Sequence, residues 1–372
     1  MKYYIIAGEA SGDLHGSNLI RELKKVDPAA SFRCWGGALM AKQGAEVVKD
    51  YRDLAFMGFF EVLSHLNTIR KNITFCKSDL LGYHPDVLIL VDYPGFNLRV
   101  AGFAHDHGIK VFYYISPQLW AWRSSRVRKI KKYVDRMFVI LPFEKDFYNR
   151  FGVEVDFIGH PLLDVINEDT IYPDRSAFLE RNRLPDKRII ALLPGSRHQE
   201  IRLVLKEMLK VIGHFPDYQF VIAGAPSVKP EFYAELISGT SATVVNGQTY
   251  DLLRHSDAAL VTSGTATLET ALMGIPQVVC YKGSVLSYWV AQWVIKVKYI
   301  SLVNLIMDRE VICELIQNNL SELTLKEELK KILEVTKRRE IISAYSGLKE
   351  KLGGRGASSR AARLMTQYLT KN

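Results

Sequence analysis

Short apolar runs alternate with amphipathic stretches along most of the chain. A short apolar run predicts a buried strand, and apolar positions three or four residues apart predict a helix. Strands that alternate with helices form parallel sheets, because each helix returns the chain to the same end of the sheet. The pattern therefore predicts an α/β protein. The expected strands are residues 3–7, 87–91, 111–115, 136–141, 155–158, 189–193, 220–224, 242–245, 259–261 and 277–281.

The strand pattern stops once and then begins again. Residues 164–187 are rich in Asp, Pro and Arg, and a new apolar run starts at residue 189. With 372 residues the chain also exceeds the usual size of a single hydrophobic core. We therefore predict two Rossmann-like, doubly wound domains over residues 1–163 and 188–345, with 164–187 as the linker.

A final amphipathic helix is expected near the C-terminus, over residues 357–372. A glycine-rich stretch at 353–356 precedes it and is interpreted as a hinge. The helix is expected to pack on the first domain or on a partner chain. The oligomeric state therefore stays open, and a homodimer is among the alternatives.

The stretch 258–276 has the layout of an anion-binding turn. A short apolar strand leads into Ser263, Gly264 and Thr265, and a helix follows. Backbone N–H groups and the helix dipole at such a turn attract negative charge. Glu269, about one turn into the helix, is placed to accept hydrogen bonds from the two hydroxyls of a ribose. The stretch predicts a nucleotide diphosphate site, although an ordinary βα turn with a capping hydroxyl has the same pattern.

Two further residues are expected beside this nucleotide. Arg197 ends a loop after the strand 189–193, and its planar guanidinium group is suited to a pyrophosphate. Asn304 follows an apolar run that leads toward the same site. We expect both side chains to contact the nucleotide.

The first strand also feeds a glycine loop and a helix, at residues 8–13. This loop matches neither the G-x-G-x-x-G dinucleotide motif nor a Walker sequence, so it gives no support for an NAD-type or ATPase-type site. Glu9, Ser11 and Asp13 nevertheless make the loop more polar than a tight connection requires. These three residues are candidate substrate contacts.

Asp92 stands directly after the apolar strand 87–91. The carboxyl ends of parallel strands line the ligand crevice of open α/β sheets, so Asp92 is our candidate general base. An Asx turn or a helix cap explains the same residue equally well. Asn97, Gln118 and His160 are further substrate candidates, although a buried hinge histidine is the commoner role for His160.

The composition is that of a folded protein with an excess of basic residues. Hydrophobic residues make up 48% of the chain and charged residues 24%, and the formal net charge is +9. This charge favours nucleotides, phosphorylated substrates, nucleic acid or an anionic membrane, without choosing among them. The four cysteines are far apart and show no C-x-x-C pair, which argues against a disulfide framework or a zinc site and fits the reducing cytoplasm.

The segment 54–66 is apolar around most of its circumference. It includes Phe56, Met57, Phe59 and Phe60, and basic residues follow it. Such a helix can enter the headgroup layer of a membrane while nearby cations meet lipid phosphates. A core or interface helix has the same pattern and is commoner. No apolar stretch approaches the length of roughly 18 residues that a membrane-spanning helix needs.

A series of short motifs, in order along residues 7–305, resembles the lipid A disaccharide synthases of Gram-negative bacteria. The motifs are AGEASGD (7–13), MGFFEVL (57–63), VDYPGFN (91–97), SPQLWAWR (116–123), LPFEK (141–145), FIGHP (157–161), LLPGSR (192–197), SGTATLE (263–269) and SLVNL (301–305). Val303 departs from the family pattern, which often has proline there. Gly95 stands where other members can carry an acid, so no second catalytic carboxylate is assigned.

The resemblance implies a glycosyltransferase of the GT-B type, whose two Rossmann-like domains face each other across a cleft. It implies transfer of 2,3-diacylglucosamine from UDP-2,3-diacylglucosamine to the 6-hydroxyl of 2,3-diacylglucosamine 1-phosphate, or lipid X. The products are UDP and a β-1,6-linked disaccharide 1-phosphate, formed with inversion at the anomeric carbon. Family members need no metal or other cofactor and are peripheral to the inner, cytoplasmic face of the inner membrane.

The candidate residues take roles within this implied reaction. Asp92 would remove the proton from the attacking hydroxyl. Residues 263–269, Arg197 and Asn304 would hold UDP without a metal ion, because the sequence has no D-x-D motif for a divalent cation. The acyl chains of both substrates favour a membrane contact for the segment 54–66.

Two alternatives stay open on the sequence. A UDP-sugar epimerase of the same two-domain fold would share the nucleotide stretch but would not need an apolar helix beside basic residues. A basic nucleic-acid-binding protein would explain the net charge of +9, but it would leave Asp92 and the two anion-binding turns without a role. The resemblance favours the glycosyltransferase, with no nucleic acid among its partners.

Overall fold

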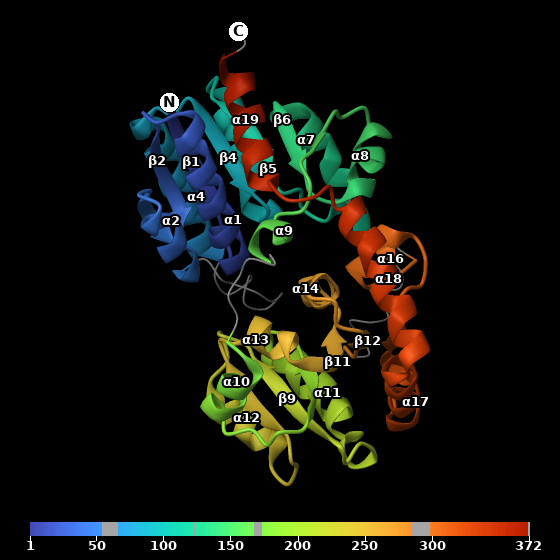
Figure 1. Cartoon of the computed structure of the whole chain (residues 1–372). Helices are drawn as coiled ribbons and strands as arrows, with labels where there is room; N and C mark the ends of the chain where they lie inside the picture. Colours follow the sequence, from blue (N-terminus) through green and yellow to red (C-terminus); the bar gives the residue numbers. More distant parts are fainter. Residues whose placement is uncertain (54–65, 123, 167–172, 284–297, 371–372) are drawn as a thin grey trace. The chain divides into compact units, whose positions relative to one another are not determined.

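Figure 1 shows the computed structural model of the chain, which describes residues 1–53, 66–122, 124–166, 173–283 and 298–370. The chain divides into two compact units. The first consists of Met1–Asp164 and Leu352–Asn372, and the second of Val165–Lys351. Each unit is built on one parallel sheet whose strands alternate with helices, which confirms the predicted fold class.

The first unit contains a seven-stranded parallel sheet in the order β3-β2-β1-β4-β5-β6-β7. Its strands are β1 (Lys2–Ala7), β2 (Ser31–Gly36), β3 (Glu46–Asp50), β4 (Val87–Val91), β5 (Lys110–Tyr114), β6 (Arg136–Val139) and β7 (Asp156–Phe157). The strand order changes direction between β1 and β4, which pair side by side. The loops that leave such a pair diverge and open a crevice where ligands bind. Glu9 follows β1 and Asp92 follows β4, so both stand at this point.

Helices cover both faces of the first sheet. One face packs against α1 (Ala10–Val26) and α19 (Ala357–Thr370), and the other against α4 (Leu66–Tyr83), α5 (Pro94–Asp106) and α7 (Val127–Tyr133). Both faces of the central strands are therefore buried, which explains their continuous apolar runs. Further helical elements are α2 (Ala38–Lys42), α6 (Leu119–Trp122), α8 (Pro142–Asn149), α9 (Leu162–Val165) and the 3-10 turns Tyr51–Asp53 and Ser124–Arg126.

The second unit contains a six-stranded parallel sheet in the order β10-β9-β8-β11-β12-β13. Its strands are β8 (Arg188–Leu193), β9 (Tyr218–Gly224), β10 (Thr243–Asn246), β11 (Ser256–Thr262), β12 (Gln277–Tyr281) and β13 (Glu314–Ile316). Its helices are α10 (Arg175–Arg181), α11 (His198–Leu209), α12 (Pro230–Ile237), α13 (Thr249–Arg254), α14 (Thr265–Leu272), α16 (Leu302–Met307), α17 (Glu322–Leu333) and α18 (Val335–Lys351), with 3-10 turns at Ile212–His214 and Gln317–Asn319. Here the strand order changes direction between β8 and β11, so this unit also has a crevice at its carboxyl edge.

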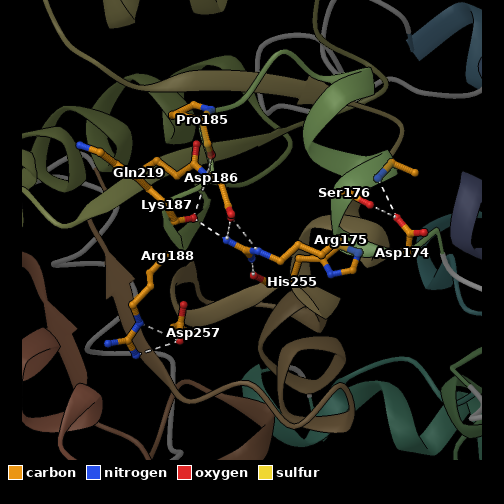
Figure 2. Close-up of polar contacts among 11 residues, drawn as sticks. Asp174, Arg175, Ser176, Pro185, Asp186, Lys187, Arg188, Gln219, His255 and Asp257 are labelled. Carbon is orange, nitrogen blue, oxygen red and sulfur yellow. Dashed lines mark hydrogen bonds and ion pairs between the residues drawn. The ribbon is translucent and has the colours of Figure 1, made fainter.

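Part of the predicted linker is folded into the second unit. It forms α10, and Phe178 of this helix belongs to the hydrophobic core of the sheet. Figure 2 shows the polar contacts that fix the segment: Arg175 donates to the carbonyl oxygens of Lys187 at 2.6 Å and of His255 at 3.2 Å. Gln219 also donates to the Lys187 carbonyl, at 2.9 Å. The segment differs from a linker because contacts with distant residues order it, and its local composition does not reveal them.

The glycine-rich stretch before α19 is packed against the end of β7. Arg360 donates hydrogen bonds to the carbonyl oxygens of Gly353 and Gly354, both at 3.1 Å. A Cβ added to Gly353 would lie 3.2 Å from the α-carbon of Gly159, so the two segments approach closely. The structure therefore has packed backbone where the sequence predicts a hinge.

Candidate active site

The crevice of the second sheet holds a pocket of about 320 Å³. It lies beyond the carboxyl ends of β8, β9 and β11, and all of its lining residues belong to the second unit. The lining includes Gly195, Ser196 and Glu200 after β8, residues 223–226 at the end of β9, and residues 262–266 with Glu269 at and beyond the end of β11. Four of the predicted nucleotide contacts, Ser263, Gly264, Thr265 and Glu269, therefore line one pocket.

The start of α14 faces this pocket. Gly264 is its N-cap residue, with a φ of +147° that favours glycine. The place where a Cβ of Gly264 would stand is open, and both Gly264 and Thr265 are exposed. Ser263 donates its hydroxyl to the carbonyl oxygen of Ile300 at 2.8 Å, which fixes the loop. The turn thus offers accessible backbone at a helix start, which is the arrangement that binds anions.

Glu269 lies about one turn into α14 and lines the same pocket. Its Oε1 accepts a hydrogen bond from the hydroxyl of Tyr250 at 2.7 Å. Burial raises the pKa of the Glu269 carboxyl, and the hydrogen bond from Tyr250 acts in the opposite direction. Tyr250 therefore orients this carboxylate and favours its charged form. The sequence does not identify Tyr250, because only the fold brings α13 to α14.

Glu200 is a pocket residue that the sequence does not identify either. It stands in the first turn of α11, and its carboxylate packs against Gly195, whose φ is +109°. Burial raises the pKa of Glu200, and the positive charge of Arg197 acts in the opposite direction. Arg197 itself is exposed at the N-cap position of α11, directly after the pocket residue Ser196. The loop after β8 and the first turn of α11 therefore combine a cation, a glycine and a half-buried acid.

Asn304 is fully buried, and its amide is used within the protein. Its Oδ1 accepts from the backbone N–H groups of Val311 and Ile312, at 2.8 and 3.2 Å. Its Nδ2 donates to the carbonyl oxygen of Ile312 and to Glu314, both at 2.9 Å. These bonds use every donor and acceptor of an asparagine amide. The structure thus gives Asn304 a scaffolding role, and its contact with a nucleotide stays a prediction.

In the first unit, Asp92 follows β4 and is exposed to solvent. Burial by the surrounding loops and, after that, the negative charge of Glu9 raise the pKa of Asp92 to about 6. Solvent reaches the side chain, yet enough protein surrounds it to disfavour its charged form. A carboxylate whose pKa approaches neutrality is suited to act as a general base.

Other predicted substrate residues stand near the same edge of the first sheet. The Asn97 amide donates to the carbonyl oxygen of Asp92 at 2.7 Å, so it supports the turn after β4. Ser11, in the first turn of α1, and Gln118, between β5 and α6, are exposed. The structure therefore brings Glu9, Asp92 and Asn97 together, and the contacts of all these side chains with substrate stay predictions.

Asp13 and His160 are buried and bonded within the protein. The carboxylate of Asp13 accepts from backbone N–H groups at the start of α2, at 2.8 to 3.1 Å. The Nδ1 of His160 accepts from the N–H of Leu162 at 3.2 Å. Burial lowers the pKa of His160 to about 3, so the ring is neutral. Both side chains have structural roles, and their predicted contacts with substrate are not tested by these bonds.

Comparison with known proteins identifies the family to which the chain belongs. A model of the Lipid-A-disaccharide synthetase family matches residues 3–367. The chain belongs to the lipid-A-disaccharide synthase family. The Lipid-A-disaccharide synthase of Geobacter sulfurreducens is 41% identical over 374 aligned residues, which cover 99% of this chain and 97% of that protein. The Lipid-A-disaccharide synthase of Nitrosococcus oceani is 42% identical over 372 residues, with 98% and 95% covered. The predicted family is confirmed, and the protein is therefore a glycosyltransferase.

Solved structures of lower identity share the fold of this lipid-A-disaccharide synthase family member. UDP-GlcNAc 2-epimerase from Neisseria meningitidis, bound to UDP-GlcNAc, matches with a TM-score of 0.67 at 14% identity, covering 100% of both chains. The glycotransferase of kitacinnamycin matches with a TM-score of 0.65 at 14% identity, covering 98% of both. These neighbours support the predicted GT-B fold. They give the epimerase alternative no further weight, because likeness at this identity concerns the fold alone.

The membrane contact of this lipid-A-disaccharide synthase family member stays a prediction. Phe56, Met57, Phe59 and Phe60 lie outside the described residues. In the part of the chain that the structure describes, no helix has both the length and the apolar character needed to cross a membrane. The same part holds no group of three or more His, Cys, Asp or Glu side chains arranged around a metal site. Independence of metal stays a prediction.

Proposed function

We propose that this member of the lipid-A-disaccharide synthase family transfers 2,3-diacylglucosamine from UDP-2,3-diacylglucosamine to the 6-hydroxyl of lipid X. The products are UDP and the β-1,6-linked disaccharide 1-phosphate, formed with inversion. Membership of the family supports the reaction. The observation that carries the proposal is the pocket at the start of α14, which offers space, accessible backbone and a carboxylate to a nucleoside diphosphate.

In this proposal the pocket of the second unit binds the UDP part of the donor. The diphosphate lies against Gly264 and Thr265 at the start of α14, and Arg197 adds positive charge from the loop after β8. Glu269 accepts from the ribose hydroxyls through Oε2, because its Oε1 already accepts from Tyr250. These contacts bind the donor without a metal ion.

Asp92 acts as the general base of the proposed reaction. The acceptor oxygen attacks the anomeric carbon from the face opposite UDP, and its proton passes to the Asp92 carboxylate. As the new C–O bond forms, the bond between the anomeric carbon and the diphosphate oxygen breaks, and its electrons leave with UDP. Arg197 and the start of α14 stabilise the charge that develops there. Attack from the opposite face inverts the anomeric centre.

We also propose that the protein binds peripherally to the cytoplasmic face of the inner membrane. Both proposed substrates carry acyl chains that stay in a lipid environment. The helix α4, which begins directly after residues 54–65, exposes Arg70 and Lys71. Cations at this position are suited to lipid phosphates, while Phe56 and Phe59 supply apolar contact.

The direct test supplies both acylated substrates to the purified protein in the presence of EDTA. We expect the disaccharide, with one UDP released for each disaccharide formed. Conversion of the UDP-sugar without acceptor would instead indicate an epimerase. Absence of product under conditions that support a relative of the same family would contradict the proposal.

The nucleotide site has its own test. Arg197→Ala and Glu269→Ala are expected to weaken UDP binding, measured by calorimetry. Lys206→Ala is the matched control, because it removes an exposed cation from α11 outside the pocket. Unchanged UDP affinity in both pocket variants would remove this pocket from consideration.

A further inference from the structure

The turn after β4 has an uncommon backbone conformation. Asp92 and Tyr93 are consecutive residues in the left-handed region, with φ at +42° and +46°. At the end of the adjacent strand, Ile115 also has a positive φ, of +66°, which is rarer still for a β-branched residue. The N–H of Asp92 donates to the carbonyl oxygen of Ile115 at 3.3 Å, so the two sites are joined. Such conformations persist only where the surrounding structure holds them.

Two buried side chains hold Asp92 by its main chain. The hydroxyl of Tyr113 donates to the Asp92 carbonyl oxygen at 2.6 Å, and the Asn97 amide donates to the same oxygen at 2.7 Å. Tyr113 comes from β5 and Asn97 from α5, and both are fully buried. Burial also raises the pKa of Tyr113 well above its ordinary value, so the hydroxyl keeps its proton and stays a donor.

Packing holds the second residue of the turn. A Cβ added to Gly8 would lie 2.5 Å from the ring of Tyr93, so the ring rests on the backbone of the loop after β1. The Tyr93 ring also stacks with Phe96, with centroids 5.7 Å apart. A rotation of the turn would have to move this ring or break the hydrogen bonds to the Asp92 carbonyl. These contacts therefore hold the conformation of the turn, and with it the direction of the Cα–Cβ bond of Asp92.

We propose that Tyr113 and Asn97 are positioning residues for the general base. They act through the carbonyl oxygen of Asp92, and by holding the left-handed turn they aim its carboxylate at the acceptor hydroxyl. This inference rests on the proposed function of Asp92. A small misplacement of a catalytic group lowers turnover steeply, whereas donor binding depends on the pocket of the second unit and is unaffected.

Tyr113→Phe tests the proposal because it removes the hydroxyl and keeps the buried ring. We expect kcat at saturating donor to fall by about 10- to 100-fold, with UDP affinity within about twofold of wild type. Tyr114→Phe is the matched control. Tyr114 is the next residue of β5, equally buried, but it packs on the opposite face of the sheet, where its hydroxyl lies 3.4 Å from Ser358.

We expect wild-type kcat in Tyr114→Phe. An equal loss of kcat in the two variants, or no loss in Tyr113→Phe, would overturn the proposal. Asn97→Leu is a second variant, for use where Tyr113→Phe does not fold. It keeps the number and branching of the side-chain heavy atoms and removes the donor, so the same fall in kcat with unchanged UDP affinity is expected. Wild-type kcat in Asn97→Leu would overturn the role of Asn97.

A double-mutant cycle separates positioning from general structural damage. Because Tyr113 acts through Asp92, Tyr113→Phe should cost no further activity when it is added to Asp92→Asn. The same loss in both backgrounds would indicate a structural defect and overturn the inference. Asp92→Asn alone is expected to lower kcat by about a hundredfold or more. Wild-type turnover in Asp92→Asn would refute Asp92 as the base. That result would contradict the proposed function, whereas the results for Tyr113→Phe test the positioning alone.

Discussion

Asp92 and Glu269 show how the fold changes the chemistry of single residues. Burial raises the pKa of both carboxyls. Asp92 has the negative charge of Glu9 beside it, whereas Glu269 receives a hydrogen bond from Tyr250. Burial and the charge of Glu9 both favour the protonated form of Asp92, whereas at Glu269 the hydrogen bond from Tyr250 opposes the effect of burial. The two carboxylates are therefore suited to different tasks, proton removal and ribose binding.

The pKa of about 6 for Asp92 predicts an acid limit of the reaction. A general base works only when it is deprotonated, so activity is present above this pKa and is lost as the pH falls through it. At saturating donor, we expect kcat/KM for the acceptor to fall by about tenfold for each pH unit below this pKa. The measurement is a pH–rate profile, which would contradict the prediction if it were flat down to about pH 5.

Glu9→Gln gives this profile an internal control. The charge of Glu9 raises the pKa of Asp92, so its removal should move the acid limb to lower pH. The position of the limb is the readout, because Glu9 is also a candidate substrate contact and its loss can change the rate itself. If the acid limb does not move, a group other than Asp92 sets the pH dependence.

The sequence indicates which polar residues stand in the turns at the edge of a sheet. It does not show which of these residues are buried and bonded within the protein. Asp92 and the stretch 263–269 each follow an apolar strand, and the carboxyl ends of such strands form one edge of a sheet. Asp13 and Asn304 look equally polar in the sequence, but the structure uses both to bind backbone N–H groups. Glu200 has no distinctive signal, since an acid in the first turn of a helix is common for reasons of stability alone.

At the level of elements, the strands that the sequence does not predict are the less apolar ones. β3 and β13 form sheet edges, where one side of the strand has no neighbour and fewer apolar residues are needed. In β2 the apolar run is interrupted by Arg33, which pairs with Asp79 and Glu46, both at 2.6 Å. Asp79 belongs to α4 and Glu46 to β3, so the local pattern of β2 cannot reveal that the charge of Arg33 is neutralised.

The loop between β8 and α11 allows a test of how its backbone conformation shapes the pocket. Gly195 has a φ of +109°, and a Cβ added there would meet the Glu200 carboxylate. Gly195→Ala should therefore strain the loop and displace that carboxylate, lowering UDP affinity by about tenfold or more in calorimetry. Gly213→Ala is the control, because Gly213 lies in a 3-10 turn of the same unit with open space at its Cβ position. Equal UDP affinities in the two variants would show that this loop does not shape the pocket.

At the level of the whole chain, the first unit is completed only by the C-terminal segment. The chain leaves this unit after Asp164 and returns to it at Leu352. Asp164 accepts a hydrogen bond from the N–H of Ser358 at 3.2 Å, so the exit and the return are tied together. Met365 of α19 belongs to the same core as β1 and β4. The amphipathic pattern of α19 reveals an apolar face, but only the fold shows which surface covers it.

Met365→Ala tests whether α19 stabilises the first unit separately from the second. Met365 is fully buried, and truncation of such a side chain costs about 2–5 kcal/mol. Hydrogen exchange in β1 and β4 should quicken, because these strands share the core of Met365. Exchange in β8 and β11 should not change, and UDP affinity should stay at the wild-type value, because the pocket is lined by the second unit alone.

Arg363→Ala is the matched control, since Arg363 lies on the exposed side of α19 and its loss should leave the exchange in both sheets unchanged. Faster exchange in β8 and β11 as well as in β1 and β4 of Met365→Ala would mean that the two units unfold together. In that case the helix would stabilise the whole chain, and the division at Asp164 and Leu352 would not mark separate folding units.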